Sequence, residues 1–125
     1  MLLDAMRPLR HLLPLGLALL LGGCGEEGIE LSSSDENYRA AQIFEERCAG
    51  CHTLDAVGSQ GSSTNVNDRE YKDGPNFNQR KESYEDVLYA IRNGGFSSGP
   101  MPQNIVVGEE AEAVARFIEQ YSGSQ

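Results

Sequence analysis

The clearest hydrophobic pattern in the chain lies near its C-terminus. Between about Glu109 and Tyr121, the apolar residues Val114, Phe117, Ile118 and Tyr121 recur at intervals of three and four positions. This spacing places them on one face of a helix with about 3.6 residues per turn. The pattern therefore predicts an amphipathic helix that buries one face against the rest of the protein.

A second helix is predicted in the first half of the chain. Ser33 is followed three positions later by Glu36, which fits a capping box at a helix start. We therefore predict a helix over about residues 35–49. Its inner face is small or apolar and its outer face charged, with Ala40, Ala41 and Phe44 inside and Glu45, Glu46 and Arg47 outside.

A third helix is predicted between these two. Ser83 with Asp86 repeats the capping pattern, and Gly94-Gly95 provides the residue type that commonly ends a helix. The apolar stripe of this helix consists of Val87, Leu88 and Ile91. No strand-like alternation is persuasive anywhere in the chain and no internal repeat is visible, so the pattern predicts an all-α fold.

Residues 53–80 carry little hydrophobic periodicity and are rich in Gly, Ser, Asn and Asp. Unstructured loops longer than about 12–15 residues are uncommon in compact domains, so this one is expected to pack on a bound group. Its most structured element is Gly74-Pro75-Asn76-Phe77. Proline fixes φ, glycine permits a turn, and Phe77 can cover an apolar ring.

Residues 1–23 have the pattern of a secretory signal. Arg7 and Arg10 precede an apolar run over residues 12–21, which is too short for a membrane span of about 20 residues. The run ends in Leu21-Gly22-Gly23-Cys24, which resembles a bacterial lipobox, so Cys24 is predicted to carry a diacylglycerol. The alternative is an ordinary signal peptide with an incidental cysteine.

Residues 24–125 form one small domain by length. They contain 18 acidic and 8 basic residues, for a net charge of −10, which excludes nucleic acid as a partner. Residues 24–34 are polar and rich in Gly and Ser, and they predict a flexible tether that reaches no more than about 35 Å when extended. Residues 35–125 are predicted to be the folded domain.

The motif that carries chemistry is Cys48-Ala-Gly-Cys51-His52, the spacing of a c-type haem attachment site. Two thiols three positions apart can each add to a vinyl group on the same haem edge, and the following histidine is placed to bind the iron. A redox-active Cys-x-x-Cys would lack its βαβ context and leave His52 without a role. With Cys24 assigned to lipid, a zinc site would lack a fourth Cys or His in residues 25–125.

Met101 is the candidate for the second iron ligand. His52 and Met101 are the only histidine and the only methionine in residues 24–125. Met101 lies in Gly99-Pro100-Met101-Pro102, where prolines on both sides restrict the backbone and present one side chain. The sequence therefore predicts axial ligation by His52 and Met101.

Together these motifs resemble the monohaem class I cytochromes c over essentially all of residues 35–121. The matching pieces are Phe44, the block from Cys48 to Thr53, Gly74-Pro75-Asn76, Met101-Pro102 and the last helix with Phe117. The resemblance implies an all-α, cytochrome c-like fold of three to four helices, with long loops wrapped around one covalently bound haem c. The sequence departs from the pattern in its long polar stretch at residues 59–73, and in Phe77, where Leu is commoner.

The resemblance also implies contacts within this fold. The first and last helices would cross, with Phe44 near Ala115 and Phe117. The backbone carbonyl of Pro75 would accept the Nδ1–H of His52 and hold its ring. Phe77 would support the haem pocket beside it.

This ligand set leads to an expected function. An iron bound by both His52 and Met101 has no open position for a substrate, so we expect a one-electron carrier of comparatively high potential, not an enzyme. Two other functions remain open. One is a permanent haem subunit of an exported oxidoreductase complex, and the other is a haem-based redox or gas sensor in which Met101 dissociates.

The leader and Cys24 lead to an expected location. We expect an exported monomer, lipid-anchored on the outer (periplasmic or extracytoplasmic) face of the cell membrane. The expected partners are membrane electron-transfer complexes, namely a quinol-oxidising complex and a terminal oxidase, or an exported dehydrogenase.

Overall fold

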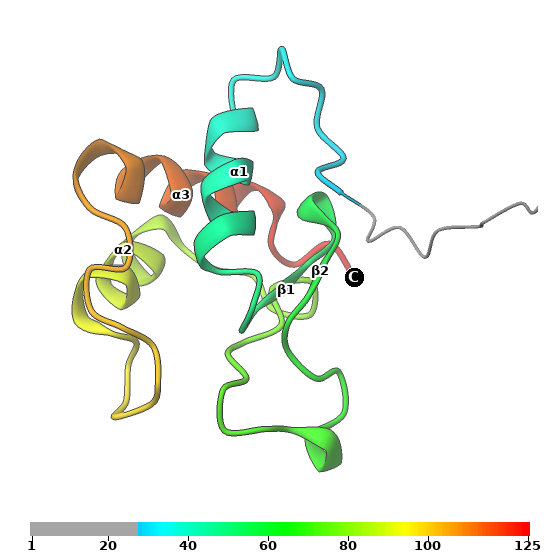
Figure 1. The fold of residues 1–125 in the computed structure, drawn as a ribbon, viewed down its shortest axis with the longest axis vertical. Coiled ribbons are helices and arrows are strands. Elements are labelled where there is room, and N and C mark those ends of the chain that lie inside the picture. The colour runs from blue at the N-terminus through cyan, green and yellow to red at the C-terminus, as the bar shows by residue number, and fades with distance from the viewer. Residues whose placement is uncertain (1–27) are drawn as a thin grey trace, which may run out of the picture.

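Three α-helices frame residues 28–125, the part of the chain that the computed structural model describes (Figure 1). The predicted leader, and Cys24 with it, lie outside the described residues. The three helices are α1 (Tyr38–Arg47), α2 (Tyr84–Asn93) and α3 (Gly108–Tyr121). The predicted all-α fold is confirmed, and α3 begins one residue earlier than its periodicity suggested.

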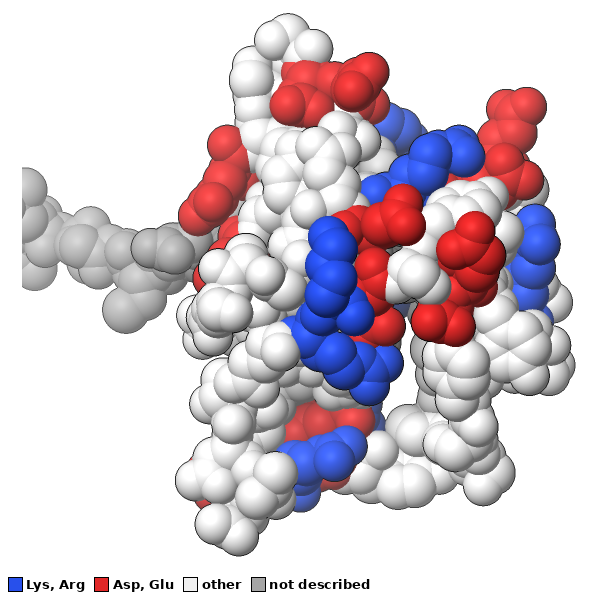
Figure 2. Space-filling model, turned by 180° about the vertical axis from the view of Figure 1, so that it is seen from behind, with Lys and Arg blue, Asp and Glu red and all other residues white. Residues whose placement is uncertain are grey.

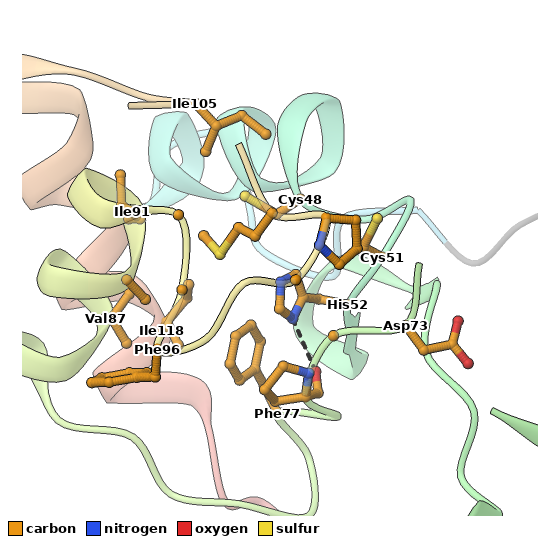
Figure 3. A pocket seen from close by; sticks show the side chains of 18 of the residues that line it. Cys48, Cys51, His52, Asp73, Phe77, Val87, Ile91, Phe96, Ile105 and Ile118 are labelled. Carbon is orange, nitrogen blue, oxygen red and sulfur yellow. Dashed lines mark hydrogen bonds between the residues drawn. The ribbon is translucent and has the colours of Figure 1, made fainter. Parts of the chain in front are cut away.

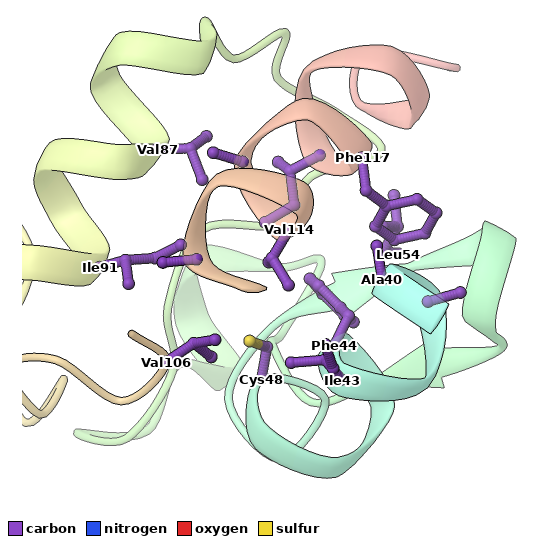
Figure 4. Close-up of a cluster of buried hydrophobic side chains, with 14 of the residues drawn as sticks. Ala40, Ile43, Phe44, Cys48, Leu54, Val87, Ile91, Val106, Val114 and Phe117 are labelled. Carbon is purple, nitrogen blue, oxygen red and sulfur yellow. The ribbon is translucent and has the colours of Figure 1, made fainter. Parts of the chain in front are cut away.

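Helix α3 packs against both other helices, and Figure 4 shows it lying between them. At its crossing with α1, the rings of Phe44 and Phe117 meet edge to face, with centroids 6.2 Å apart. Both rings are completely buried, and this geometry is the preferred one for aromatic pairs. The predicted contact between the first and last helices is confirmed.

The apolar stripes of the three helices meet in one buried core. Of the residues predicted to face inward on the three helices, all are buried except Tyr121, which is only partly covered. Ile43 and Ala111 are buried as well. Five buried residues join this core from outside the three α-helices: Cys48, Leu54, Val57, Phe77 and Val106. The loops therefore contribute to the core directly.

The predicted capping box of the first helix is wrong. Helix α1 begins at Tyr38, and its N-cap Asn37 makes no side-chain cap bond. The carboxylate of Asp35 accepts the backbone N–H of Asn37 at 2.7 Å, and the Asp35 carbonyl accepts the N–H of Tyr38 at 3.0 Å. An aspartate can close such a turn with its own side chain, so the chain turns here and the helix starts later.

Helix α2 begins and ends as predicted. The Ser83 hydroxyl accepts the backbone N–H of Asp86 at 3.2 Å. At the other end, Gly94 and Gly95 have φ of 75° and 84°, a left-handed conformation that glycine adopts without steric cost. The N-cap serine and the glycines at the C-terminal end both adjoin the helix in the sequence, so the bounds of α2 could be predicted from local residues.

Residues 29–31 pack on the domain, although they were expected to belong to the flexible tether. Ile29 and Leu31 are partly buried against the core, and the backbone N–H of Glu30 donates to the carbonyl of Ala56 at 3.1 Å. The chain between this contact and Cys24 is therefore shorter than the predicted tether.

The long loop after His52 contains a small hairpin that the sequence did not predict. Strand β1 (Thr53–Leu54) pairs antiparallel with β2 (Ser59–Gln60), and the 3₁₀ turn η1 (Asp55–Val57) joins them. A second 3₁₀ turn, η2 (Val66–Asp68), follows. Strands of two residues are too short to show an alternating pattern.

Serine and threonine hydroxyls hold this loop together. Thr53 Oγ1 donates to the carbonyl of Ser62 at 3.0 Å, and the backbone N–H of Thr53 donates to Ser62 Oγ at 3.1 Å. Ser59 Oγ donates to the carbonyl of His52 at 3.1 Å. These three buried backbone groups thus find hydrogen-bond partners in hydroxyl groups of the loop.

No helix within residues 28–125 has the length and apolar character needed to cross a bilayer.

Candidate functional site

A cavity of about 350 Å³ lies between the C-terminal end of α1, helix α2 and the segment before α3. Its volume falls within the range of about 300–1,000 Å³ typical of cofactor sites. Figure 2 shows this side of the molecule hollowed between two lobes, with Lys and Arg atoms along the hollow. Six residues predicted to hold or support a cofactor all line it: Cys48, Cys51, His52, Pro75, Phe77 and Met101.

The end of α1 delivers the two thiols to this cavity. The backbone N–H of Cys48 donates to the carbonyl of Phe44 at 2.7 Å, and the carbonyl of Cys48 accepts N–H groups from Cys51 and His52. This tight turn brings both Cys48 and Cys51 to the cavity wall (Figure 3). Neither is joined in a disulfide.

The environment of Cys48 argues against a thioredoxin-type reaction. Burial raises the pKa of the Cys48 thiol to about 12, with a smaller contribution from the charge of Cys51. A redox nucleophile needs a lowered pKa, because the thiolate is the reactive form. The zinc alternative also lacks support, since residues 28–125 hold no group of three His, Cys, Asp or Glu side chains arranged to bind a metal ion.

His52 is held as a neutral imidazole. Burial lowers its pKa, which the hydrogen bond with Pro75 only partly opposes. Nδ1 lies 3.0 Å from the carbonyl oxygen of Pro75 (dashed in Figure 3). A carbonyl can only accept, so Nδ1 carries the proton and Nε2 keeps its lone pair. A neutral imidazole with this free nitrogen is the form that binds a metal.

The turn that supplies Pro75 packs closely on the imidazole. The backbone N–H of Gly74 donates to the carbonyl of Cys51 at 2.8 Å. A Cβ at position 74 would lie only 2.3 Å from Cε1 of His52. Position 74 therefore requires glycine, because the backbone comes so close to the His52 ring. The sequence alone predicted only a turn at this position.

Gly74→Ala is expected to disturb this arrangement while leaving every hydrogen-bond donor in place. Either the ring of His52 or the turn must move, and overpacking of this kind costs about 1–3 kcal/mol. Thermal unfolding of the haem-loaded protein measures the loss. Gly50→Ala is the control, because a Cβ there meets no atom within 4 Å. Equal stability of the two variants would contradict the close packing of Gly74 on His52.

Met101 reaches the cavity from a loop that is fastened to α2. The backbone N–H of Asn104 donates to the carbonyl of Ile91 at 2.8 Å. A Cβ at Gly94 would lie 2.8 Å from the carbonyl oxygen of Met101, and one at Gly95 would lie 3.9 Å from its sulfur. The two glycines that end α2 thus make room for the loop that presents Met101.

Large side chains near the cavity divide into those that line it and those that pack elsewhere. Ile105 lines the cavity, whereas Tyr84 and Tyr89 do not. Tyr84 lies under the guanidinium of Arg116, and Tyr89 stacks on Phe96, with centroids 5.1 Å apart. Phe96 does line the cavity, and no periodic pattern could have identified it, because it follows the end of α2 in a loop.

Charged residues also reach the cavity. Four of the 8 basic residues in residues 24–125 line it: Arg47, Arg69, Lys72 and Arg80. Asp73, Glu82 and Asp86 line it as well, and Arg80 is paired with Glu82. The acidic character of the chain as a whole therefore does not extend to this site.

These residues fit one covalently attached haem. Cys48 and Cys51 would hold it by thioether bonds, and His52 and Met101 supply a nitrogen and a sulfur, both of which bind haem iron. Apolar side chains from α2 and α3, including Val87, Ile91 and Ile118, complete the lining. The donor set and the cavity thus suit the same group.

Comparison with known proteins agrees with this geometry. The family model of cytochrome c matches residues 38–122. Among solved structures, the chain is similar to the c-type cytochrome SorU from Sinorhizobium meliloti, with 35% identity, a TM-score of 0.54, and coverage of 70% of this chain and 91% of that chain. A comparison with curated proteins gives no significant match. The chain therefore belongs to the cytochrome c family, whose members transfer electrons on a covalently bound haem c.

Proposed function

We propose that this protein is a membrane-tethered one-electron carrier in which His52 and Met101 bind the two axial positions of the haem iron. The observation that carries the proposal is the shared cavity. Two ligands from segments about fifty residues apart in the sequence line it together with the two thiols. When bound, the haem would supply an iron that alternates between the ferrous and ferric states.

The side chains of the cavity would each have a distinct part in this function. Pro75 holds the proton of His52 on Nδ1 and raises the basicity of the ring. The thioether sulfur of Met101 favours ferrous iron, and apolar residues such as Val87 and Ile91 exclude water. Both effects raise the reduction potential. With His52 and Met101 both bound to the iron, no position would remain for a substrate, which favours a carrier over an enzyme.

The proposed location rests on the leader and on Cys24. A lipid on Cys24 would hold an exported protein at the outer face of the membrane, and a short tether raises its effective concentration near membrane complexes. We infer that its partners are a quinol-oxidising complex and a terminal oxidase, or an exported dehydrogenase.

Potentiometry of the purified full chain tests the carrier function. We expect one reversible transition that involves a single electron, and no consumption of oxygen or peroxide by the reduced protein beyond slow autoxidation. A two-electron transition, or sustained turnover of peroxide, would contradict a carrier with both axial positions filled.

Cys24→Ser is expected to move the haem-containing protein from the membrane fraction to the soluble fraction. The helices of residues 28–125 cannot span a bilayer, and a net charge of −10 for residues 24–125 provides no attraction to anionic lipids. Fractionation followed by a haem stain measures this. Wild-type protein, treated in parallel, should leave the membrane only in detergent. A variant that stayed bound through a high-salt wash would contradict lipid anchoring at Cys24.

A further inference from the structure

The ring of Phe77 lies flat against the imidazole of His52. The two ring centroids are 4.6 Å apart and the planes differ by only 7°. Figure 3 shows both residues at the cavity. Phe77 is buried, and on another side it meets Phe44 edge to face at 6.1 Å. The Pro75 hydrogen bond fixes one atom of the imidazole, whereas a stacked ring fixes the plane of the whole ring.

The backbone of Phe77 is itself held on both sides. Its N–H donates to the carbonyl of Thr53 at 2.9 Å, and its carbonyl accepts the N–H of Gly123 at 2.8 Å. The first bond ties Phe77 to the residue after His52. The second ties it to the end of the chain, so the position of the aromatic ring depends on residues after α3.

Residues 122–125, which we name the C-terminal strap, follow the segment that starts at Phe77. Ser122 is buried, and its hydroxyl accepts the N–H of Glu82 at 3.0 Å. The N–H of Gln125 donates to the carbonyl of Asn78 at 3.1 Å. The C-terminal strap therefore forms hydrogen bonds to both ends of the segment 77–82.

Gly123 allows the strap to come this close. Its φ is 69°, and a Cβ there would lie 3.0 Å from Cβ and 3.1 Å from Cα of Lys81. The ammonium of Lys81 in turn bonds the carbonyl of Glu119. Any other residue at position 123 would be strained in its backbone and crowded against the Lys81 main chain.

We propose that the C-terminal strap is a positioning element that acts through Phe77 to fix the ring plane of His52 on the haem. This inference rests on the proposed ligation of the iron by His52. The orientation of an axial imidazole sets how unpaired electron density is distributed over the haem. A loosened strap would let Phe77 move, change that orientation and admit water beside the ligand, which lowers the reduction potential.

Three haem-loaded full-chain variants test the proposal. Gly123→Ala disturbs the strap, and Phe77→Leu keeps an apolar side chain but removes the flat ring. Gly108→Ala is the matched control, because Gly108 also has a positive φ, of 60°, yet a Cβ there meets no atom within 4 Å. The readouts are the haem-methyl NMR shifts of the ferric protein and the reduction potential, measured well below the unfolding temperature of each variant.

We expect Gly123→Ala and Phe77→Leu to change the pattern of methyl shifts in the same sense and to lower the potential. Gly108→Ala should lose stability but keep the wild-type pattern. A wild-type pattern in Gly123→Ala would overturn the proposal, as would the same altered pattern in Gly108→Ala. If Gly123→Ala does not fold, removal of Gln125 alone should give a weaker form of the same change, and no change would overturn the proposal.

The same spectra separate this inference from the proposed function. A wild-type protein without the signature of a histidine-bound, low-spin iron would refute ligation by His52 itself. A wild-type protein with that signature, together with variants that match it, would refute only the role of the C-terminal strap.

Discussion

Replacing both Cys48 and Cys51 by alanine is expected to abolish covalent haem and to leave the domain unfolded. The cavity of about 350 Å³ is lined by residues from all three helices and from the loops between them, so its occupant joins every part of the fold. At ~24 cal/mol per Å³, an empty space of this size would cost at most about 8 kcal/mol. A small domain has a total stability of only about 5–15 kcal/mol.

Haem staining after denaturing electrophoresis, far-UV circular dichroism and limited proteolysis measure this result. Cys24→Ser is the matched control, because it removes a cysteine outside the cavity-lining set and should keep both haem and fold. A double variant that remained compact and resistant to protease would show that the haem does not organise this fold.

Met101→Ala is expected to keep the haem attached but to remove its second axial ligand. Loss of the soft sulfur should lower the reduction potential and allow the reduced protein to bind carbon monoxide. Helix content should change little, because the bond from Asn104 to Ile91 still fastens the loop to α2. Lys72 also lines the cavity, so if its amine enters the vacated position, Met101→Ala with Lys72→Ala should bind carbon monoxide more readily still.

Carbon monoxide titration and potentiometry of wild type and variant, side by side, measure this effect. Ile105→Ala is the control, because Ile105 lines the same cavity but has no atom that can bind iron. Wild-type protein that bound carbon monoxide as readily as Met101→Ala would show that Met101 is not a firm ligand. Such a result would favour the sensor function over the carrier function.

The helices could be predicted where their signals are local. Helix α2 carries its own start at Ser83 and its own end at Gly94, and α3 shows its apolar face within four turns. The start of α1 was mispredicted, because two local patterns competed and the Asx turn at Asp35 formed where the Ser33 capping box was expected. A choice between two such patterns depends on small differences in free energy that residue spacing does not show.

Features that join distant segments could not be predicted. Residues 29–31 read as a polar tether, but the partner of Glu30 is Ala56, whose position depends on the hairpin between β1 and β2. Serine and threonine in the long loop gave a correct signal for irregular structure. Their hydroxyls also provide the hydrogen bonds that organise it, as the pair Thr53 and Ser62 shows.

The candidate site was the most predictable part of the molecule, because the types and spacing of its residues indicate its chemistry. One Cys-x-x-Cys-His motif and one methionine between prolines identified residues that the fold brings to the same cavity. The supporting contacts were harder to predict. The stacking of Phe77 on His52 joins residues 25 positions apart, and the hydrogen bond from Gly123 to Phe77 joins residues 46 positions apart.

The central claim is that Cys48 and Cys51 hold a haem covalently, with His52 and Met101 as its axial ligands. Visible spectra of the purified protein, oxidised, reduced and then denatured in alkaline pyridine, test both parts together. We predict the pyridine spectrum of a haem joined by two thioethers, sharp low-spin bands in the reduced native protein, and the weak red band of a bond between methionine sulfur and ferric iron. A haem that acidic organic solvent extracts, or a native spectrum of high-spin iron, would contradict the account.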